Sequence, residues 1–276
     1  MKRVIIPSFI VLSIFVVLYY SSFIDLLNIW NTQEDYSHGY LIIPISLYLL
    51  WRKKSIIVNQ PVQPTNLGLI PMVLWACLYF IGIIGQVATF VYVSQILFLI
   101  GVSLFIAGRS VTKAILFPIL FLVFMYPIPS EIYVKLTGPL KLFATTYSVN
   151  ILSILNVPVI QEGNLINLPE YSMKVVEACS GLRSLLSVIA LSFLIGYLFF
   201  ESYLYRVILF ILSVPIAIIG NISRIVVTAL LAYHVSPAYA EGFAHTMAGL
   251  MAFGVSLLIL YCVVYIIRWI PIKRDL

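Results

Sequence analysis

The stretch Val175-Val-Glu-Ala-Cys-Ser-Gly-Leu-Arg-Ser184 is a polar island that leads directly into an apolar run ending near Phe200. A membrane-spanning helix requires about 20 consecutive apolar residues, and this run has that length. We therefore expect a span from about Ser180 to Phe200, with Cys179 just before its first turn. The same polar island holds the residues that first suggest a chemical function.

The composition indicates a membrane protein. Hydrophobic residues make up 62% of the chain and charged residues 9%, whereas a soluble domain carries roughly 25% charged residues. The apolar runs are long and do not alternate, so helical spans are expected rather than barrel strands. In a membrane protein the net charge of +6 reflects basic cytoplasmic loops, and we expect no nucleic-acid partner. The chain has no CxxC pair, so neither a metal site nor a disulfide framework is suggested, and we expect no cofactor.

Working outward from the polar island, we expect about eight transmembrane helices with both termini on the inside. The expected spans are 4–24, 39–51, 67–84, 87–107, 112–126, 180–200, 207–233 and 243–267. Lys and Arg gather at the inner ends of these spans, and none lies in the outer loops up to Tyr126. The positive-inside rule therefore sets the topology. The prediction is an all-α, multi-pass protein of the cytoplasmic (inner) membrane, with residues 1–276 forming a single membrane domain in contact with the lipid bilayer.

An outer-side insertion, about 127–178, separates the fifth and sixth expected spans. In its first half, Ser130 to Asn156, apolar residues recur at helical spacing with polar residues between them. This pattern predicts an amphipathic helix in the outer interface, and Gly138-Pro139 is a candidate break in it. The second half contains short β-prone runs between the turn signals Glu162-Gly163-Asn164 and Pro169-Glu170. These predict a small β-flap over the membrane surface.

The expected topology brings three reactive side chains to one membrane depth. Cys179 precedes the sixth span, Arg224 lies in the outer half of the seventh, and His245 is near the outer start of the eighth. Each has a plainer explanation: helix packing for the cysteine, headgroup contact for the arginine and a satisfied interface position for the histidine. However, an arginine at the centre of a span costs at least ~2.5 kcal/mol, so its presence there requires a partner or a function. The shared depth favours a site.

These three groups are suited to thiol chemistry. The start of a helix lowers the pKa of a thiol and favours the thiolate. A thiolate can attack a carbonyl to give an acyl-enzyme, while a histidine moves protons to and from the reacting groups. An arginine can stabilise the developing oxyanion or orient a substrate carboxylate. We therefore predict Cys179, Arg224 and His245 as catalytic residues on the extracytoplasmic side.

Other polar residues are candidates for binding or supporting the substrate. Asn221 shares a helix face with Arg224, and Thr228 continues this polar stripe. The full set of supporting candidates is Asn221, Arg183, His38, Glu177 and Ser180. For Arg183 a headgroup contact is the plainer explanation, and Glu177 could simply face water. The many Tyr and Trp residues are expected to belong mostly to the interface belt or to packing.

At these residues the chain resembles the exosortase/archaeosortase family. The matching segments are Glu177-Ala-Cys-Ser-Gly-Leu182, Asn221-Ile-Ser-Arg224, His245 and Asp35-Tyr-Ser-His-Gly-Tyr-Leu-Ile-Ile-Pro44. The resemblance implies a membrane-embedded cysteine transpeptidase that cleaves C-terminal sorting signals of exported, membrane-anchored proteins. Such a signal consists of a short motif, typically Pro-Glu-Pro, followed by a transmembrane helix and a basic tail. The resemblance assigns the catalytic roles to Cys179, Arg224 and His245.

Two other classes of function stay open on the sequence alone. The chain could be an assembly or transport factor for exopolysaccharide or lipid-linked glycan, in which Arg224 binds a phosphate. It could also be a purely structural membrane partner. The acceptor that resolves the acyl-enzyme is either an amine or water.

Overall fold

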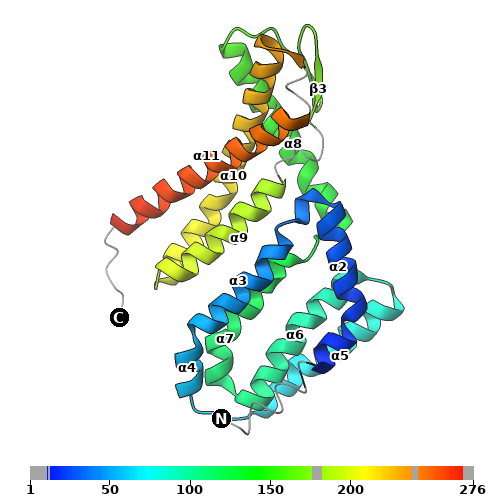
Figure 1. The fold of residues 1–276 in the computed structure, drawn as a ribbon, viewed down its shortest axis with the longest axis vertical. Coiled ribbons are helices and arrows are strands. Elements are labelled where there is room, and N and C mark those ends of the chain that lie inside the picture. The colour runs from blue at the N-terminus through cyan, green and yellow to red at the C-terminus, as the bar shows by residue number, and fades with distance from the viewer. Residues whose placement is uncertain (1–10, 12, 176–181, 238–241, 270–276) are drawn as a thin grey trace. The chain divides into compact units, whose positions relative to one another are not determined.

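The computed structural model describes residue 11 and residues 13–175, 182–237 and 242–269 (Figure 1). Its contacts group into two compact units, Met1–Pro129 and Ser130–Leu276. The boundary falls just after Pro127-Ile-Pro129, where the outer-side insertion was expected to begin. Each unit is described by itself below, and the prediction of a single domain over 1–276 stays a prediction.

The described residues form an all-α membrane protein with one small sheet, but they do not support eight spans. Four helices are long and apolar enough to cross a membrane: Asn66–Ile84, Ala88–Ala107, Tyr203–His234 and Met247–Trp269. A fifth is counted if Arg109–Met125 and Ser130–Ile154 are taken as one broken span.

The expected span near 39–51 accounts for part of this difference. It corresponds to a shorter apolar helix, Gly39–Arg52, which rises about 21 Å at 1.5 Å per residue and is shorter than the ~30 Å of a bilayer core. The expected span near 180–200 corresponds to the 18-residue helix Leu182–Phe199. The first expected span, 4–24, begins among residues outside the described part of the chain.

The first unit is a set of helices joined by tight turns. Its elements are α2 (Tyr20–Thr32), η1 (Glu34–Tyr36), α3 (Gly39–Arg52), α4 (Lys54–Asn59), η2 (Asn66–Gly68), α5 (Leu69–Ile84), α6 (Ala88–Ala107), α7 (Arg109–Phe121) and η3 (Leu122–Met125). The longest apolar helices, α5 and α6, pack side by side, and α3 packs against α7 and η3.

A hydrogen-bonded group of polar side chains lies inside the first unit. Trp75 Nε1 donates to Tyr19 Oη at 2.8 Å, and Tyr19 Oη lies 2.6 Å from Ser94 Oγ. Beside them, Tyr126 Oη donates to Gln95 Oε1 at 2.8 Å, and Gln95 Nε2 donates to Ser22 Oγ at 2.9 Å. These bonds satisfy buried polar groups, and they tie α2, α5, α6 and the end of η3 together.

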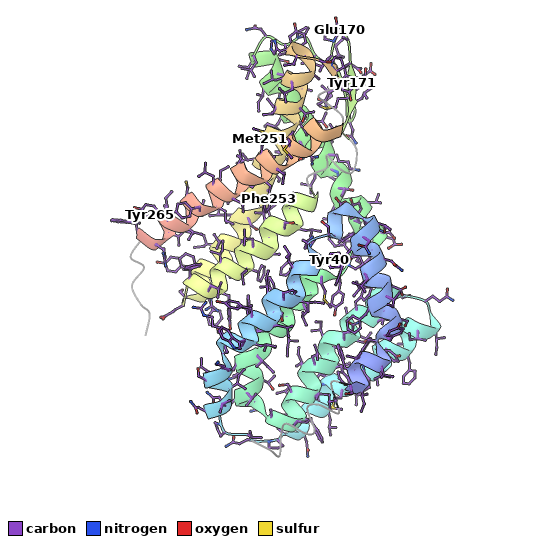
Figure 2. The ribbon with its side chains drawn as sticks, viewed as in Figure 1. Tyr40, Glu170, Tyr171, Met251, Phe253 and Tyr265 are labelled. Carbon is purple, nitrogen blue, oxygen red and sulfur yellow. The ribbon has the colours of Figure 1, made fainter. Side chains whose placement is uncertain are left out.

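The second unit is built around the long helix α10. Its elements are α8 (Ser130–Ile154), β1 (Ile160–Glu162), β2 (Leu165–Asn167), β3 (Ser172–Lys174), α9 (Leu182–Phe199), α10 (Tyr203–His234) and α11 (Gly242–Trp269). Helix α10 packs against α8, α9 and α11. Figure 2 marks Met251 and Tyr265 on α11, whose side chains are exposed. Exposed apolar side chains of this kind are expected on helices that face lipid.

Helix α8 is continuous through Pro139, so the candidate break at Gly138-Pro139 was wrong. A proline inside a helix removes one backbone hydrogen bond and favours a kink. One face of α8 is buried from Thr137, just before the proline, to Leu152, well after it. The packing of this face explains why the helix continues despite the lost bond. Its place in the membrane interface stays a prediction.

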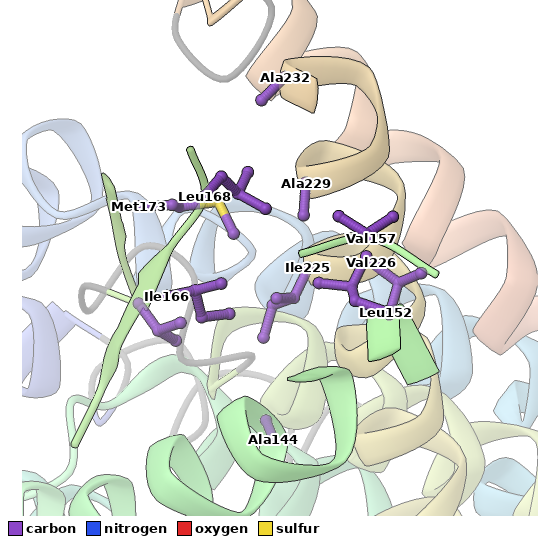
Figure 3. Close-up of a cluster of buried hydrophobic side chains, with 11 residues drawn as sticks. Ala144, Leu152, Val157, Ile166, Leu168, Met173, Ile225, Val226, Ala229 and Ala232 are labelled. Atoms are coloured by element: carbon purple, nitrogen blue, oxygen red, sulfur yellow. The ribbon is translucent and has the colours of Figure 1, made fainter. Parts of the chain in front are cut away.

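The expected β-rich region forms a three-stranded antiparallel sheet in the order β1-β2-β3. Ile166 pairs with Met173 in the ladder, and both side chains are buried. They join a hydrophobic cluster with Leu152 of α8 and Ile225 of α10 (Figure 3). After β3, Val175 is buried in the same cluster and its N–H donates to the carbonyl of Asn164 at 2.9 Å. The sheet therefore packs against the C-terminal third of α10.

Candidate functional site

Helices α9 and α10 are joined by a short turn and run antiparallel, which sets the level of each residue along the pair. A Cβ added at Gly196 would lie 3.6 Å from Arg206 Cα, so these two positions are neighbours. Leu182, the start of α9, is 14 residues before Gly196, and Gly220 of α10 is 14 residues after Arg206. Because the helices are antiparallel, Leu182 and Gly220 are about level. Arg224 therefore lies about 6 Å beyond that level, at 1.5 Å per residue.

Helices α10 and α11 approach each other through glycine. A Cβ added at Gly220 would collide with Ser256 Oγ and would lie 3.1 Å from the carbonyl oxygen of Ala252. One turn further along α10, the guanidinium of Arg224 lies against Gly249, where an added Cβ would be 3.4 Å from Cζ and Nη2. Small residues thus let the two helices pack closely, and one of them provides the space for the arginine.

The polar stripe predicted on α10 is present in the structure. Asn221, Arg224 and Thr228 lie within about 60° of one another around the helix axis, at 100° per residue. The stripe runs between Gly220, which faces α11, and Ile225, which faces the hydrophobic cluster. Arg224 is half-buried and has an interaction partner.

The two neutral members of the stripe are almost completely buried. Asn221 is 4% exposed and Thr228 is 2% exposed. Within the described part of the chain, neither Asn221 Oδ1 nor Thr228 Oγ1 has a hydrogen-bond partner. Buried polar atoms of this kind are uncommon and often mark a functional site.

His245 lies in the first turn of α11, four residues before Gly249. Residues four apart share a helix face, so His245 is on the stripe that includes Ala248, Gly249 and Ala252. Ala248 and Ala252 are buried, whereas the side chain of His245 is outside the described part. The backbone of α11 thus places His245 one turn from the contact between Arg224 and Gly249.

The remaining candidates of the second unit surround the start of α9. Arg183 is the second residue of α9, and its side chain is not among those described. Cys179, Glu177 and Ser180 lie outside the described residues, between Val175 and Leu182. Their roles stay predictions.

His38, the candidate in the first unit, forms a hydrogen bond with the C-terminal end of η3. Its Nε2 lies 3.0 Å from the carbonyl oxygen of Phe124 and, because a carbonyl only accepts, it is the donor. Trp30 Nε1 donates to the next carbonyl, that of Met125, at 3.0 Å. The chain then passes through Pro127 and Pro129, which have no N–H to offer these carbonyls. His38 and Trp30 supply the donors that the two prolines cannot.

Two more residues complete this arrangement around the end of η3. The N–H of Ile128 donates to Tyr36 Oη at 3.2 Å, and burial raises the pKa of the Tyr36 hydroxyl above its usual value. The indole of Trp30 fills the space where a Cβ at Gly39 would lie. The segment Tyr36-Ser-His-Gly39 and Trp30 therefore form a clamp on residues 124–128, called here the carbonyl clamp.

Trp30 and Gly249 are the functional candidates that the sequence argument did not single out. Trp30 is one of the aromatic residues expected in the interface belt or in packing, and Gly249 was not among the candidates. The signal for Trp30 was available in the pair Pro127 and Pro129, because two prolines after an apolar helix leave carbonyls that need other donors. In the described residues, no group of three His, Cys, Asp or Glu side chains could hold a metal ion.

Comparison with known proteins matches the chain to a family. The family model described as transmembrane exosortase (Exosortase_EpsH) matches residues 30–262. This range begins at Trp30 of the carbonyl clamp and includes the polar stripe and most of α11. No curated protein and no solved structure matches the chain.

Proposed function

Because the chain belongs to the transmembrane exosortase family, we propose that it is a membrane-embedded cysteine protease or transpeptidase that cleaves C-terminal sorting signals of exported proteins. The observation that carries this proposal is the contact between Arg224 and Gly249. It sets an arginine beside α11 one turn from His245, and both belong to the residues implied by the family resemblance. The proposed location is the cytoplasmic membrane, with the site on its extracytoplasmic side.

The proposed reaction has two balanced steps. The thiolate of Cys179 attacks the scissile carbonyl, and Arg224 stabilises the oxyanion that forms. The C–N bond then breaks, His245 protonates the leaving amine, and a thioester remains on Cys179. An incoming amine or water loses its proton to His245 and attacks the thioester, which releases the product and restores the thiolate.

Chain connectivity supports the proposed role of Cys179. Cys179 is four residues after Val175, a distance of at most about 14 Å along the chain, and three residues before Leu182, at most about 11 Å. Val175 is packed with Ile225 of α10, and Leu182 lies about level with Gly220. Both ends of the connecting segment are thus fixed near the part of α10 that carries Arg224, and the segment is long enough to reach it.

The experiment that tests the proposal is processing of a tagged substrate in a membrane that contains the protein. The substrate carries a Pro-Glu-Pro motif, a transmembrane helix and a basic tail. Cys179→Ala should leave the substrate uncleaved, and a thioester on Cys179 should be detectable by mass spectrometry in the unmodified protein. Cys77→Ala and Cys262→Ala are matched controls, because both cysteines are exposed on helices and neither is in the proposed site.

Normal processing by Cys179→Ala would overturn the proposal. A protein that assembles glycans would give a different pattern. In that case Cys179→Ser would be nearly silent, whereas Arg224→Ala would abolish glycan output because the phosphate-binding group is lost.

A further inference from the structure

We propose that one end of the second unit, where the C-terminus of α9 meets the start of α10 and the end of α11, binds the phosphate of an anionic phospholipid. Two arginines, Arg206 and Arg268, carry this inference because both contact the last residues of α9 or the residue that follows them. The inference goes beyond the proposed cleavage reaction and does not depend on it.

Arg206 is held by one backbone bond and two aromatic rings. Its Nε donates to the carbonyl oxygen of Phe200 at 2.9 Å, directly after the end of α9. Its Cζ lies 5.5 Å from the centre of the Tyr197 ring and 5.2 Å from that of Tyr203, within the range of a cation–π interaction. The backbone bond uses Nε alone, so within the described residues the N–H groups on the two Nη atoms have no acceptor.

Arg268 reaches the same place from α11. It is the next-to-last residue of that helix, and its Cζ lies 5.2 Å from the centre of the Phe199 ring. Because Phe199 and Phe200 are consecutive, the two arginines contact the same end of α9. Ile267, the neighbour of Arg268, is buried in one hydrophobic cluster with Phe200. This cluster fixes the end of α11 beside α9.

No acidic side chain neutralises this positive charge in the described part of the chain. Glu201, which lies between the end of α9 and Arg206, is exposed and forms no ion pair with either arginine there. Arg268 is exposed and Arg206 is half-buried, so an anion from outside the protein can reach both. The planar fork of an arginine matches the oxygens of a phosphate, which makes a phosphate group the best-fitting anion.

The surroundings favour a lipid over a soluble phosphate. The candidate spans Tyr203–His234 and Met247–Trp269 begin and end here, which puts the arginines at the level of the lipid headgroups. Tyr203 and Trp269 are 79% and 73% exposed, and Tyr265 projects from the last turns of α11 (Figure 2). Exposed aromatic side chains of this kind are typical of the membrane interface. This end is expected on the cytoplasmic side, where the leaflet carries anionic lipids.

Arg109 shows what an inner-end arginine looks like without such a setting. It is the first residue of α7 in the first unit, is expected on the same side of the membrane and is exposed. Within the described residues its guanidinium has neither a ring contact nor a hydrogen bond. Arg109 is therefore a matched control for the loss of one positive charge.

The first test is native mass spectrometry of the full chain, purified in detergent and titrated with phosphatidylglycerol or with zwitterionic phosphatidylcholine. We expect phosphatidylglycerol to bind more tightly. Arg206→Gln and Arg268→Gln should each weaken its binding about fivefold, and the double variant should weaken it about 25-fold if the two effects add. Arg109→Gln should leave the affinity almost unchanged. Equal weakening by Arg109→Gln and Arg206→Gln would overturn the inference, because the lipid would then respond to net charge alone.

A second test locates the lipid in the unmodified protein. Phosphatidylglycerol with a photoactivatable headgroup should form crosslinks within residues 197–206 and 265–269, and crosslinks confined to other segments would overturn the inference. If Arg206→Gln does not fold, this measurement and Arg268→Gln still test the site, because Arg268 is exposed and contacts only one ring. Displacement of the lipid by inorganic phosphate at equal concentration would overturn the assignment to a lipid. Both measurements are made without a protein substrate, so they stand apart from any failure of the proposed cleavage.

Discussion

The guanidinium of Arg224 lies against Gly249, so that a Cβ added at Gly249 would be 3.4 Å from Arg224 Cζ and Nη2. This contact joins the polar stripe of α10 to the face of α11 that includes His245. An arginine in a membrane helix requires a defined environment, because its charge is costly in lipid. Part of that environment is Gly249 on the neighbouring helix, which has no side chain to displace the guanidinium.

The size of residue 249 should therefore control activity. Gly249→Ala places its Cβ at an ordinary van der Waals distance from Arg224, and we expect processing within about threefold of the unmodified protein. Gly249→Leu adds branches that must displace the guanidinium, at a cost of about 1–3 kcal/mol if they force repacking. If that cost falls on the transition state, it corresponds to about a 5- to 150-fold loss of kcat/KM. Equal processing by the alanine and leucine variants would show that the arginine is not held by this contact.

A second prediction concerns the closest approach of α10 and α11. Gly220→Ala places a Cβ against Ser256 Oγ, so the two helices must separate or the serine must move. We expect a loss of about 1–3 kcal/mol in the free energy of unfolding, measured by thermal unfolding in detergent. Gly254→Ala is the matched control on α11, since an added Cβ there has nothing within 4 Å.

A double variant tests whether the Ser256 hydroxyl causes this loss of stability. Adding Ser256→Ala to Gly220→Ala removes the colliding oxygen and leaves the carbonyl of Ala252 at 3.1 Å and the Cβ of residue 256 at 3.3 Å. The double variant should recover part of the lost stability. If the two substitutions are simply additive, the Ser256 hydroxyl is not the source of the strain.

The sequence predicted the fold where hydrophobicity and turn signals were unambiguous. The long helices α5, α6, α10 and α11 and the turns of the sheet follow directly from apolar runs and from Gly and Pro positions. The family resemblance is confirmed by the match over residues 30–262. The described residues do not support eight spans, because apolar composition alone does not measure helix length and the helix at 39–52 has only 14 residues.

The candidate site could be predicted only in part for a similar reason. The i, i+3 and i+7 spacing is sufficient to put Asn221, Arg224 and Thr228 on one stripe. It cannot show which helix faces that stripe, because facing depends on packing between distant segments. For the same reason, the carbonyl clamp could not be predicted from the sequence around His38, since its bonding partners are 86 and 95 residues away from their donors.

The third prediction tests the donor role of Trp30. Trp30→Phe keeps an aromatic ring beside Gly39 but removes the N–H that binds the carbonyl of Met125. A buried carbonyl without a partner costs about 1–3 kcal/mol, and the unfolding temperature should fall accordingly. Tyr40→Phe is the control, because its hydroxyl bond to Asn31 is exposed and should contribute little. Equal effects of the two substitutions would contradict the carbonyl clamp.

The fourth prediction separates a structural from a chemical role for His38. Its Nε2 donates to the carbonyl of Phe124, so a side chain that keeps a donor but cannot transfer protons should preserve the function of a clamp. We expect His38→Gln to retain processing within about fivefold, and His38→Leu to lower both stability, by about 1–3 kcal/mol, and the amount of folded protein. If His38 were an acid or base in the reaction, glutamine would lower kcat by about 10²–10⁴-fold while the protein stayed folded. Measuring kcat and thermal unfolding for both variants therefore assigns His38 either to the carbonyl clamp or to the reaction.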